Sequence, residues 1–182
     1  SHGLDQSRLD GVQFSGACFT NFSQDHLDYH KSKDDYFEAK ALLFRQLLTS
    51  DKTAVFNVNN NRIKLLAEEL KSQGNLVVTL GKSKGSNIQL KRQTFDSSGQ
   101  EVFFNYDGIL YQKRLNLIGG FQAENVLMAA ALVISLGSEP QDVFNVLNNL
   151  IANLNFENQE QLQEYFKNFN ISIDDLREKI EI

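Results

Sequence analysis

Short apolar runs alternate with helical patterns through the first eighty residues. The apolar runs, which are typical of strands buried on both faces, occupy 17–19, 53–58 and 75–81. Between them, apolar residues recur at helical spacing over 34–50 and 60–74. In the first of these helices the residues expected on one apolar face are Phe37, Ala41, Phe44 and Leu48. This order predicts a parallel α/β sheet with helices covering both faces.

The pattern changes after residue 86. Apolar and polar residues alternate over 87–117, with breaks at the sequences DSSG and YDG, which predicts a small antiparallel meander. A helix is expected over 119–137, buried along its nearly all-apolar second half. Another is expected to begin at Ser138, as N-cap, with Pro140 in its first turn.

Two regions follow from this organisation. Residues 1–150 are predicted to form one α/β domain, and 151–182 are predicted to form a polar, helix-prone tail. The chain opens with SHGLDQSRLDG rather than a methionine, as if inside a domain, so we expect it to be a fragment of a longer protein.

Composition narrows the classes of function. The net charge is −5 and no long basic run occurs, which argues against a nucleic-acid partner. No apolar run approaches membrane-spanning length. The single cysteine, Cys18, excludes an internal disulfide and fits a reducing cytoplasm. Oligomeric state is not indicated.

The sequence TNFSQDHLDYHKS, residues 20–32, contains two histidines. His26 and His30 stand four residues apart, which would place both imidazoles on one face of a helix. The glutamate of the zincin motif is absent, and no third histidine or cysteine lies nearby. Spacing alone therefore favours a polar loop, with Asp25 and Asp28 capping backbone donors, over a metal site.

Lys40 falls on the apolar face of its predicted helix. A lysine there must extend to solvent, find a partner, or lose its proton, because desolvation disfavours the ammonium form. A neutral amine could act as a base, form a Schiff base, or take up carbon dioxide as a carbamate, and a carbamate could orient a hard cation. A lysine that merely covers apolar surface is the alternative.

Four segments together resemble the central ATPase domain of the Mur ligase family: SHGLDQSR, FTNFSQDHLDYH, YFEAKALLF and GGFQAENVLMAAA. Within that family the first two are similar to the branch that adds the third amino acid of the peptidoglycan stem. The resemblance runs from Ser1 to about Leu150, and the tail does not match it.

The resemblance implies roles for five residues. His26 would ligate magnesium, and Lys40, as N6-carboxylysine, would help to hold the same ion. Gln6 and Arg8 would contact the UDP-muramoyl-dipeptide, and Asn125 would lie near the nucleotide. His30 would be structural, so the histidine loop would hold a metal ion through His26 alone.

The implied activity is amide formation driven by ATP and Mg²⁺ in the cytoplasm. ATP would phosphorylate a D-glutamate carboxylate, and the amine of a diamino acid, by default meso-diaminopimelate, would displace phosphate. The sequence has no phosphate-binding loop with a GKT/S signature, and no C-terminal amino-acid-binding domain is recognisable, so the chain alone is expected to be inactive. The segment FNVNNNR has asparagines where the family usually has an N-A-D-D turn, and Gln122 stands where an asparagine is common in the family.

Two alternatives remain. One is a degenerate Mur-like module that binds a partner or a nucleotide sugar without catalysis. The other is a related amide ligase, either lysine-adding or similar to cyanophycin or folylpolyglutamate synthetases.

Overall fold

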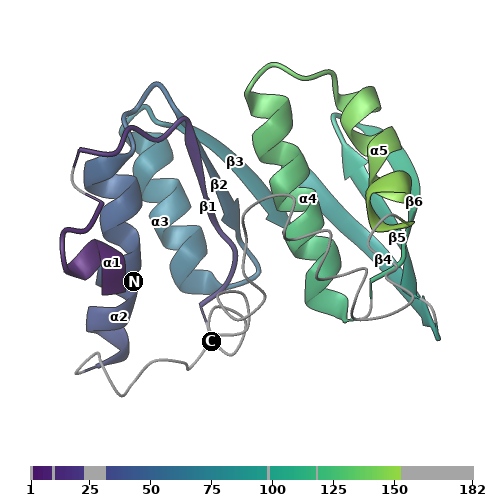
Figure 1. The fold of residues 1–182 in the computed structure, drawn as a ribbon, viewed down its shortest axis with the longest axis horizontal. Helices are drawn as coiled ribbons and strands as arrows, with labels where there is room; N and C mark the ends of the chain where they lie inside the picture. Colours follow the sequence, from purple (N-terminus) through teal and green to yellow (C-terminus); the bar gives the residue numbers. More distant parts are fainter. Residues whose placement is uncertain (1, 10, 23–31, 98, 118, 153–182) are drawn as a thin grey trace, which may run out of the picture.

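A single six-stranded sheet forms the centre of the molecule, with strands in the order β1-β2-β3-β4-β5-β6 and helices packed against it (Figure 1). The computed structural model describes residues 2–9, 11–22, 32–97, 99–117 and 119–152. The strands are β1 Gly16–Phe19, β2 Thr53–Asn57, β3 Leu76–Gly81, β4 Ile88–Asp96, β5 Gly99–Tyr106 and β6 Ile109–Leu115. The helices are α1 His2–Asp5, α2 Lys33–Leu42, the π-helical turn η1 Leu43–Leu47, α3 Asn61–Ser72, α4 Gly120–Ser135 and α5 Pro140–Ala152.

The first three strands are parallel, as the sequence predicts. β1 pairs with β2 so that Phe19 lies beside Phe56, and β2 pairs in turn with β3. Every residue of β2 is buried, which is the pattern of a central strand covered on both faces. β1 forms one edge of the sheet among the described strands.

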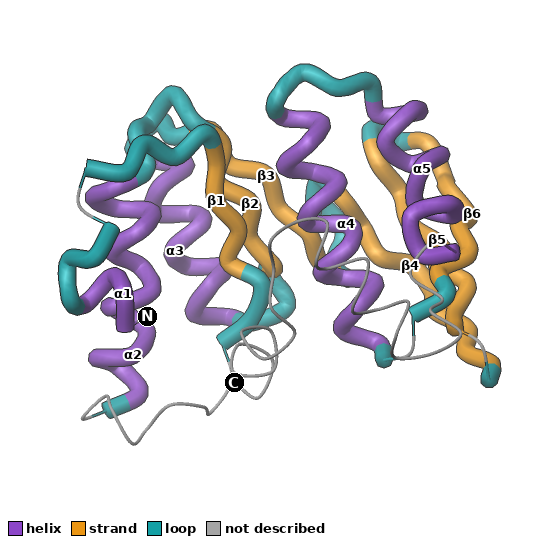
Figure 2. The backbone as a smooth tube through the Cα atoms, in the orientation of Figure 1, coloured by secondary structure: helices purple, strands orange, loops and turns teal. Residues whose placement is uncertain are grey.

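Two hydrophobic cores lie on opposite faces of these strands. Ala54 and Phe56 pack with α2 and α3, whereas Val55 packs with α4 (Figure 2). The predicted apolar face of the first helix is confirmed, since all four of its residues are buried: Phe37, Ala41, Phe44 and Leu48. The regular helix is shorter than predicted because it passes into η1 at Leu43.

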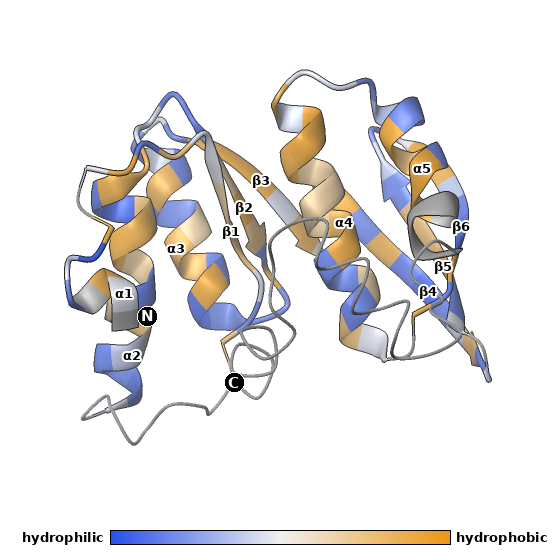
Figure 3. Ribbon diagram, viewed as in Figure 1, coloured by the Kyte–Doolittle hydropathy of each residue, from blue (hydrophilic) through white to orange (hydrophobic). Residues whose placement is uncertain are grey.

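The antiparallel meander is confirmed, with turns at the predicted breaks between β4, β5 and β6. It continues the parallel sheet directly, because Leu80 and Gly81 of β3 pair with Ile88 and Gln89 of β4. Hydrophobic and hydrophilic residues alternate at the start of β4 (Figure 3), where Ile88 and Leu90 are buried on the core. α4 and α5 cover the buried face of the meander, with Phe144 of α5 against Phe104 and Tyr111.

Two local predictions are wrong. The second half of α4 is only partly buried: Ala130 and Ala131 are in the core, but Val133 is 45% and Leu136 59% exposed. An apolar stretch of helix packed on one side necessarily leaves other residues facing outward. Ser138 is not the N-cap, because α5 begins at Pro140 and the first helical hydrogen bonds end on the carbonyl of Glu139.

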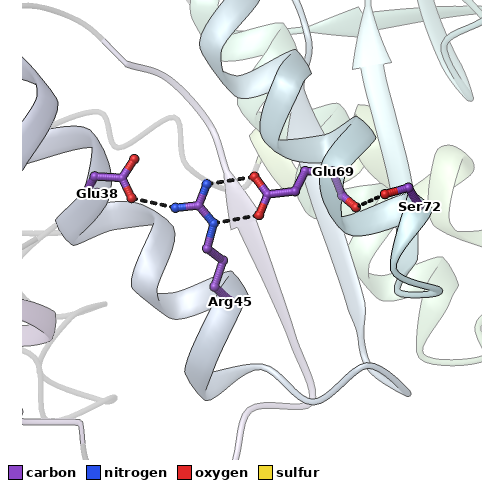
Figure 4. Close-up of polar contacts among 4 residues, drawn as sticks. All are labelled: Glu38, Arg45, Glu69 and Ser72. Carbon is purple, nitrogen blue, oxygen red and sulfur yellow. Dashed lines mark hydrogen bonds and ion pairs between the residues drawn. The ribbon is translucent and has the colours of Figure 1, made fainter.

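Polar contacts tie α2 and η1 to α3. The Arg45 guanidinium donates two hydrogen bonds of 2.8 Å to the Glu69 carboxylate and also contacts Glu38 (Figure 4). The hydrogen bond from Arg45 holds the pKa of Glu69 below its usual range. All three side chains are partly solvent-exposed, so their main effect is to fix the two helices side by side rather than to stabilise the fold strongly.

Cys18 is half-buried between β1 and α4, and its thiol lies 3.8 Å from the carbonyl oxygen of Met128. Burial raises the pKa of this thiol to about 11, so it stays protonated and is a poor nucleophile near neutral pH. In the described part of the chain, no helix has the length and apolar character needed to cross a bilayer. Of the predicted helical tail, 151–182, the first two residues belong to α5, and 153–182 lie outside the described residues.

Candidate functional site

The carboxyl ends of β1, β2 and β3 meet at one edge of the sheet, where ligands bind in open parallel α/β sheets. Two groups of polar side chains lie at this edge. Lys40 is on the face covered by α2, next to the end of β1. Asn57 and Glu124 are on the opposite face, where β2 ends near the start of α4.

Lys40 is half-buried among aromatic rings. Its Nζ lies 4.8 Å from the centre of the Tyr36 ring and 5.7 Å from that of Phe19. None of the described residues forms an ion pair with it. Among the described residues, its amine therefore contacts aromatic rings rather than a carboxylate.

Glu124 is held by two asparagine amides. Its Oε2 accepts a hydrogen bond of 2.6 Å from Asn57 Nδ2, and its Oε1 accepts one of 3.1 Å from Asn59 Nδ2. No cation among the described residues pairs with this carboxylate. A negative group fixed in place but not neutralised is suited to accept further hydrogen bonds from a ligand.

The asparagine-rich turn after β2 has a defined structure. Asn57 Oδ1 accepts from the backbone N–H of Asn59, and Asn59 Oδ1 accepts from that of Lys82. Asn60 is the N-cap of α3, where its Oδ1 accepts from the N–H groups of Arg62 and Ile63. Asn60 thus caps α3, and Asn59 places an amide rather than a second carboxylate beside Glu124.

The remaining predicted residues are less closely gathered. Gln6 and Arg8 are exposed in the turn after α1, a helix that packs against α2, so they lie on the same side of the sheet as Lys40. Asn125 follows Glu124 in α4 and is half-buried. His26 and His30, with Asp25 and Asp28, lie outside the described residues.

No metal centre is assembled by the described residues alone. Within them, no three His, Cys, Asp or Glu side chains form a group that could hold a metal ion. A metal site at this edge would need Lys40 in a modified, anionic form together with a ligand from another segment, such as His26.

Sequence reasoning missed Glu124 and the contact between Asn59 and Glu124. The asparagine turn was noticed only as a departure from a family pattern. The available signal was the position of both segments, because a turn after a central parallel strand and the start of a helix after the meander can meet only at the carboxyl edge.

Comparisons with known proteins point to one family. The family described as Mur ligase middle domain matches residues 1–133. A UDP-N-acetylmuramoyl-L-alanyl-D-glutamate--2,6-diaminopimelate ligase from Caulobacter vibrioides is 39% identical over 150 residues, which cover 82% of this chain and 31% of that protein. The ligase of the same name from Rickettsia typhi is 35% identical over 150 residues, covering 82% of this chain and 30% of that protein.

Solved structures give the same result. A structure of UDP-N-acetylmuramoyl-L-alanyl-D-glutamate--2,6-diaminopimelate ligase superposes with a TM-score of 0.73 at 26% identity, covering 82% of this chain and 31% of that one. MurF ligase from Thermotoga maritima in complex with ADP has a TM-score of 0.62 at 16% identity, covering 75% and 31%, and shares the fold. The chain spans about a third of the length of these relatives.

Proposed function

This chain belongs to the Mur ligase middle-domain family, and from that premise we propose that it is part of an ATP-dependent amide ligase of peptidoglycan synthesis. The whole protein would join meso-diaminopimelate to UDP-N-acetylmuramoyl-L-alanyl-D-glutamate in the cytoplasm. The single observation that carries this proposal is the 39% identity, over 82% of the chain, to a relative with that name.

The nucleotide would lie at the carboxyl edge of the sheet, on the face of α4. Adenine carries an exocyclic amine, which donates hydrogen bonds, and Glu124 offers a fixed acceptor there. Asn125, the next residue of α4, can both donate and accept, as recognition of a purine edge requires. Asn57 and Asn59 would act as positioning residues by holding the Glu124 carboxylate.

The acceptor substrate would lie on the face of α2. Gln6 and Arg8 are exposed there and would contact the UDP-muramoyl-dipeptide, and a guanidinium binds two oxygens of a carboxylate or phosphate at once. Lys40, as a carbamate, would supply an anionic oxygen ligand to Mg²⁺, with His26 as a nitrogen ligand. When bound, this ion supplies charge stabilisation for the transferred phosphoryl group.

We expect Lys40 to carry a carbamate in the folded chain in bicarbonate buffer. Its surroundings are compatible with this because no described carboxylate pairs with the amine, whose ammonium form such a pair would stabilise. Native mass spectrometry should show a species heavier by the mass of carbon dioxide that disappears on acidification. Lys33→Arg, on the exposed start of the same helix, should keep the added mass, and Lys40→Arg should lose it.

An unmodified Lys40 ammonium that only makes cation–π contacts would give no carbamate mass. If the Nζ of Lys40 only rests as an ammonium on the rings of Tyr36 and Phe19, no added mass will depend on residue 40. Such an outcome would remove Lys40 from the metal site.

We expect no ligase turnover from the 182-residue chain alone. The sequence has a GKS tripeptide at 81–83 but no G-x-x-x-x-G-K-S/T loop, because Leu76 stands where the first glycine would be. Backbone amides and a lysine of such a loop are what hold the phosphates of ATP. ADP release should equal that of a protein-free blank when ATP, Mg²⁺, diaminopimelate and the UDP-muramoyl-dipeptide are supplied. ADP release that depends on the dipeptide would contradict this expectation.

A further inference from the structure

A cavity of about 260 Å³ lies between α3 and the loop that joins β3 to β4. Its apolar lining comes from Val58, Ala67 and Val77. Lysines and hydroxyl groups also line it, contributed by α3 and by the loop: Lys64, Lys71, Ser83, Lys84 and Ser86. We call this cavity the lysine pocket. It contains neither Lys40 nor Glu124, and so it is distinct from the site proposed above.

The lining of the lysine pocket carries a net positive charge, whereas the chain as a whole is negative. Three lysines line it with one acidic residue, Glu68, whereas the whole chain has a net charge of −5. Lys64 Nζ is 3.8 Å from Glu68 Oε1. Lys71 and Lys84 form no ion pair with any residue in the described ranges. Lys71 and Lys84 therefore border the cavity without an ion-pair partner among the described residues.

The loop that carries Lys84 is held in place at both ends. Asn87 Oδ1 accepts hydrogen bonds of 2.9 Å from both the N–H and the hydroxyl of Thr79, and Asn87 N–H donates back to that hydroxyl. At the other end, Lys82 N–H donates to Asn59 Oδ1. A Cβ on Gly81 would lie 2.8 Å from both Ser86 Oγ and Val58 Cγ2, so the loop folds tightly onto the strand ends.

We propose that the lysine pocket binds a small phosphate monoester with an apolar body. Lysine ammonium groups act as point charges that suit a phosphate dianion, and serine hydroxyls can donate to its oxygens. The apolar floor suits a compact hydrocarbon or ring attached to the phosphate, and the volume limits the ligand to a small molecule. Because the loop is already fixed, binding requires little ordering of the backbone.

Phenyl phosphate is a suitable probe because it combines a phosphate dianion with one apolar ring. Titrated into the ¹⁵N-labelled 182-residue chain, it should shift amide resonances in two segments, 64–71 and 83–87. The double variant Lys71→Gln/Lys84→Gln should bind at least about tenfold more weakly by calorimetry, because each substitution removes a charge-assisted hydrogen bond to the phosphate. Both residues are exposed, so the variant should keep the fold.

The matched control is Lys33→Gln/Lys91→Gln, which removes the same charge at two exposed lysines outside the pocket. It should bind phenyl phosphate as the unaltered chain does. Inorganic phosphate and phenol, which each carry one half of the probe, should both bind several-fold more weakly.

Four results would overturn the proposal. The first is a set of amide chemical-shift changes that lie only outside 64–71 and 83–87. The second is phenyl phosphate binding by the Lys71/Lys84 double variant as tight as that of the unaltered chain, and the third is weakening by the control variant as large as that of the double variant. The fourth is binding of either half-probe as tight as that of phenyl phosphate.

Discussion

Replacing Phe19 with alanine should lower the free energy of unfolding of the chain by about 3 to 5 kcal/mol. Phe19 is 3% exposed, and its ring centre lies 5.6 Å from that of Phe44, 5.7 Å from Phe37 and 6.4 Å from Phe56. The substitution would leave a cavity at the centre of this aromatic cluster, where close-packed neighbours can relax only in part. Urea unfolding monitored by circular dichroism measures the change.

The matched control for Phe19→Ala is Leu65→Ala in α3. Leu65 is 56% exposed, so its truncation should change the unfolding free energy by no more than about 0.5 kcal/mol. A loss of stability as small as that of the control would show that the α2 face is not the packed core described above.

Replacing Gly99 with alanine should destabilise the chain by about 2 to 4 kcal/mol. Gly99 has φ +152°, and an added Cβ would lie 2.2 Å from the carbonyl oxygen of Leu115 on the neighbouring strand. The pairing of β5 with β6 would have to open at this point. The adjacent Gln100 is fully buried and donates to the carbonyls of Leu117 and Gly119, so the disturbance should reach the start of α4.

Gly108→Ala is the control that distinguishes the cost of a positive φ from the cost of the steric clash expected for Gly99→Ala. Gly108 also has a positive φ, +80°, in the turn between β5 and β6, but an added Cβ would meet nothing within 4 Å. It should cost only about 1 kcal/mol, from the backbone conformation alone. Thermal unfolding of the two variants measures the difference, and equal losses would mean that the contact with Leu115 is relieved without cost.

The regular elements followed from local pattern because their physical causes are local. Continuous apolar runs predicted β2 and β3, and helical spacing predicted the buried face of α2. The turn at Asp107–Gly108 was identified from residues that tolerate positive φ, as both do here. The error in the second half of α4 arose because burial depends on which neighbour packs beside a helix, whereas the cap of α5 was misplaced by one residue, at Ser138 instead of Glu139.

Only part of the candidate site was predicted, because local sequence patterns do not show contacts between distant segments. Lys40 was identified because its place on an apolar helix face is visible in the sequence. Glu124 was missed because its partners, Asn57 and Asn59, lie more than sixty residues earlier in the chain. The roles predicted for Lys40, His26, Gln6, Arg8 and Asn125 stay predictions.

The sequence by itself determined the order of strands and helices, the parallel pairing of the first half and the family of the domain. These depend on residue type and short-range spacing, which fix backbone preference and the direction of each apolar face. Only the tertiary structure decided that the meander extends the same sheet, that Glu124 meets the asparagine turn, and that Lys71 and Lys84 border one cavity. Such contacts join residues from separate elements, and their formation depends on how the packed layers bring those elements together.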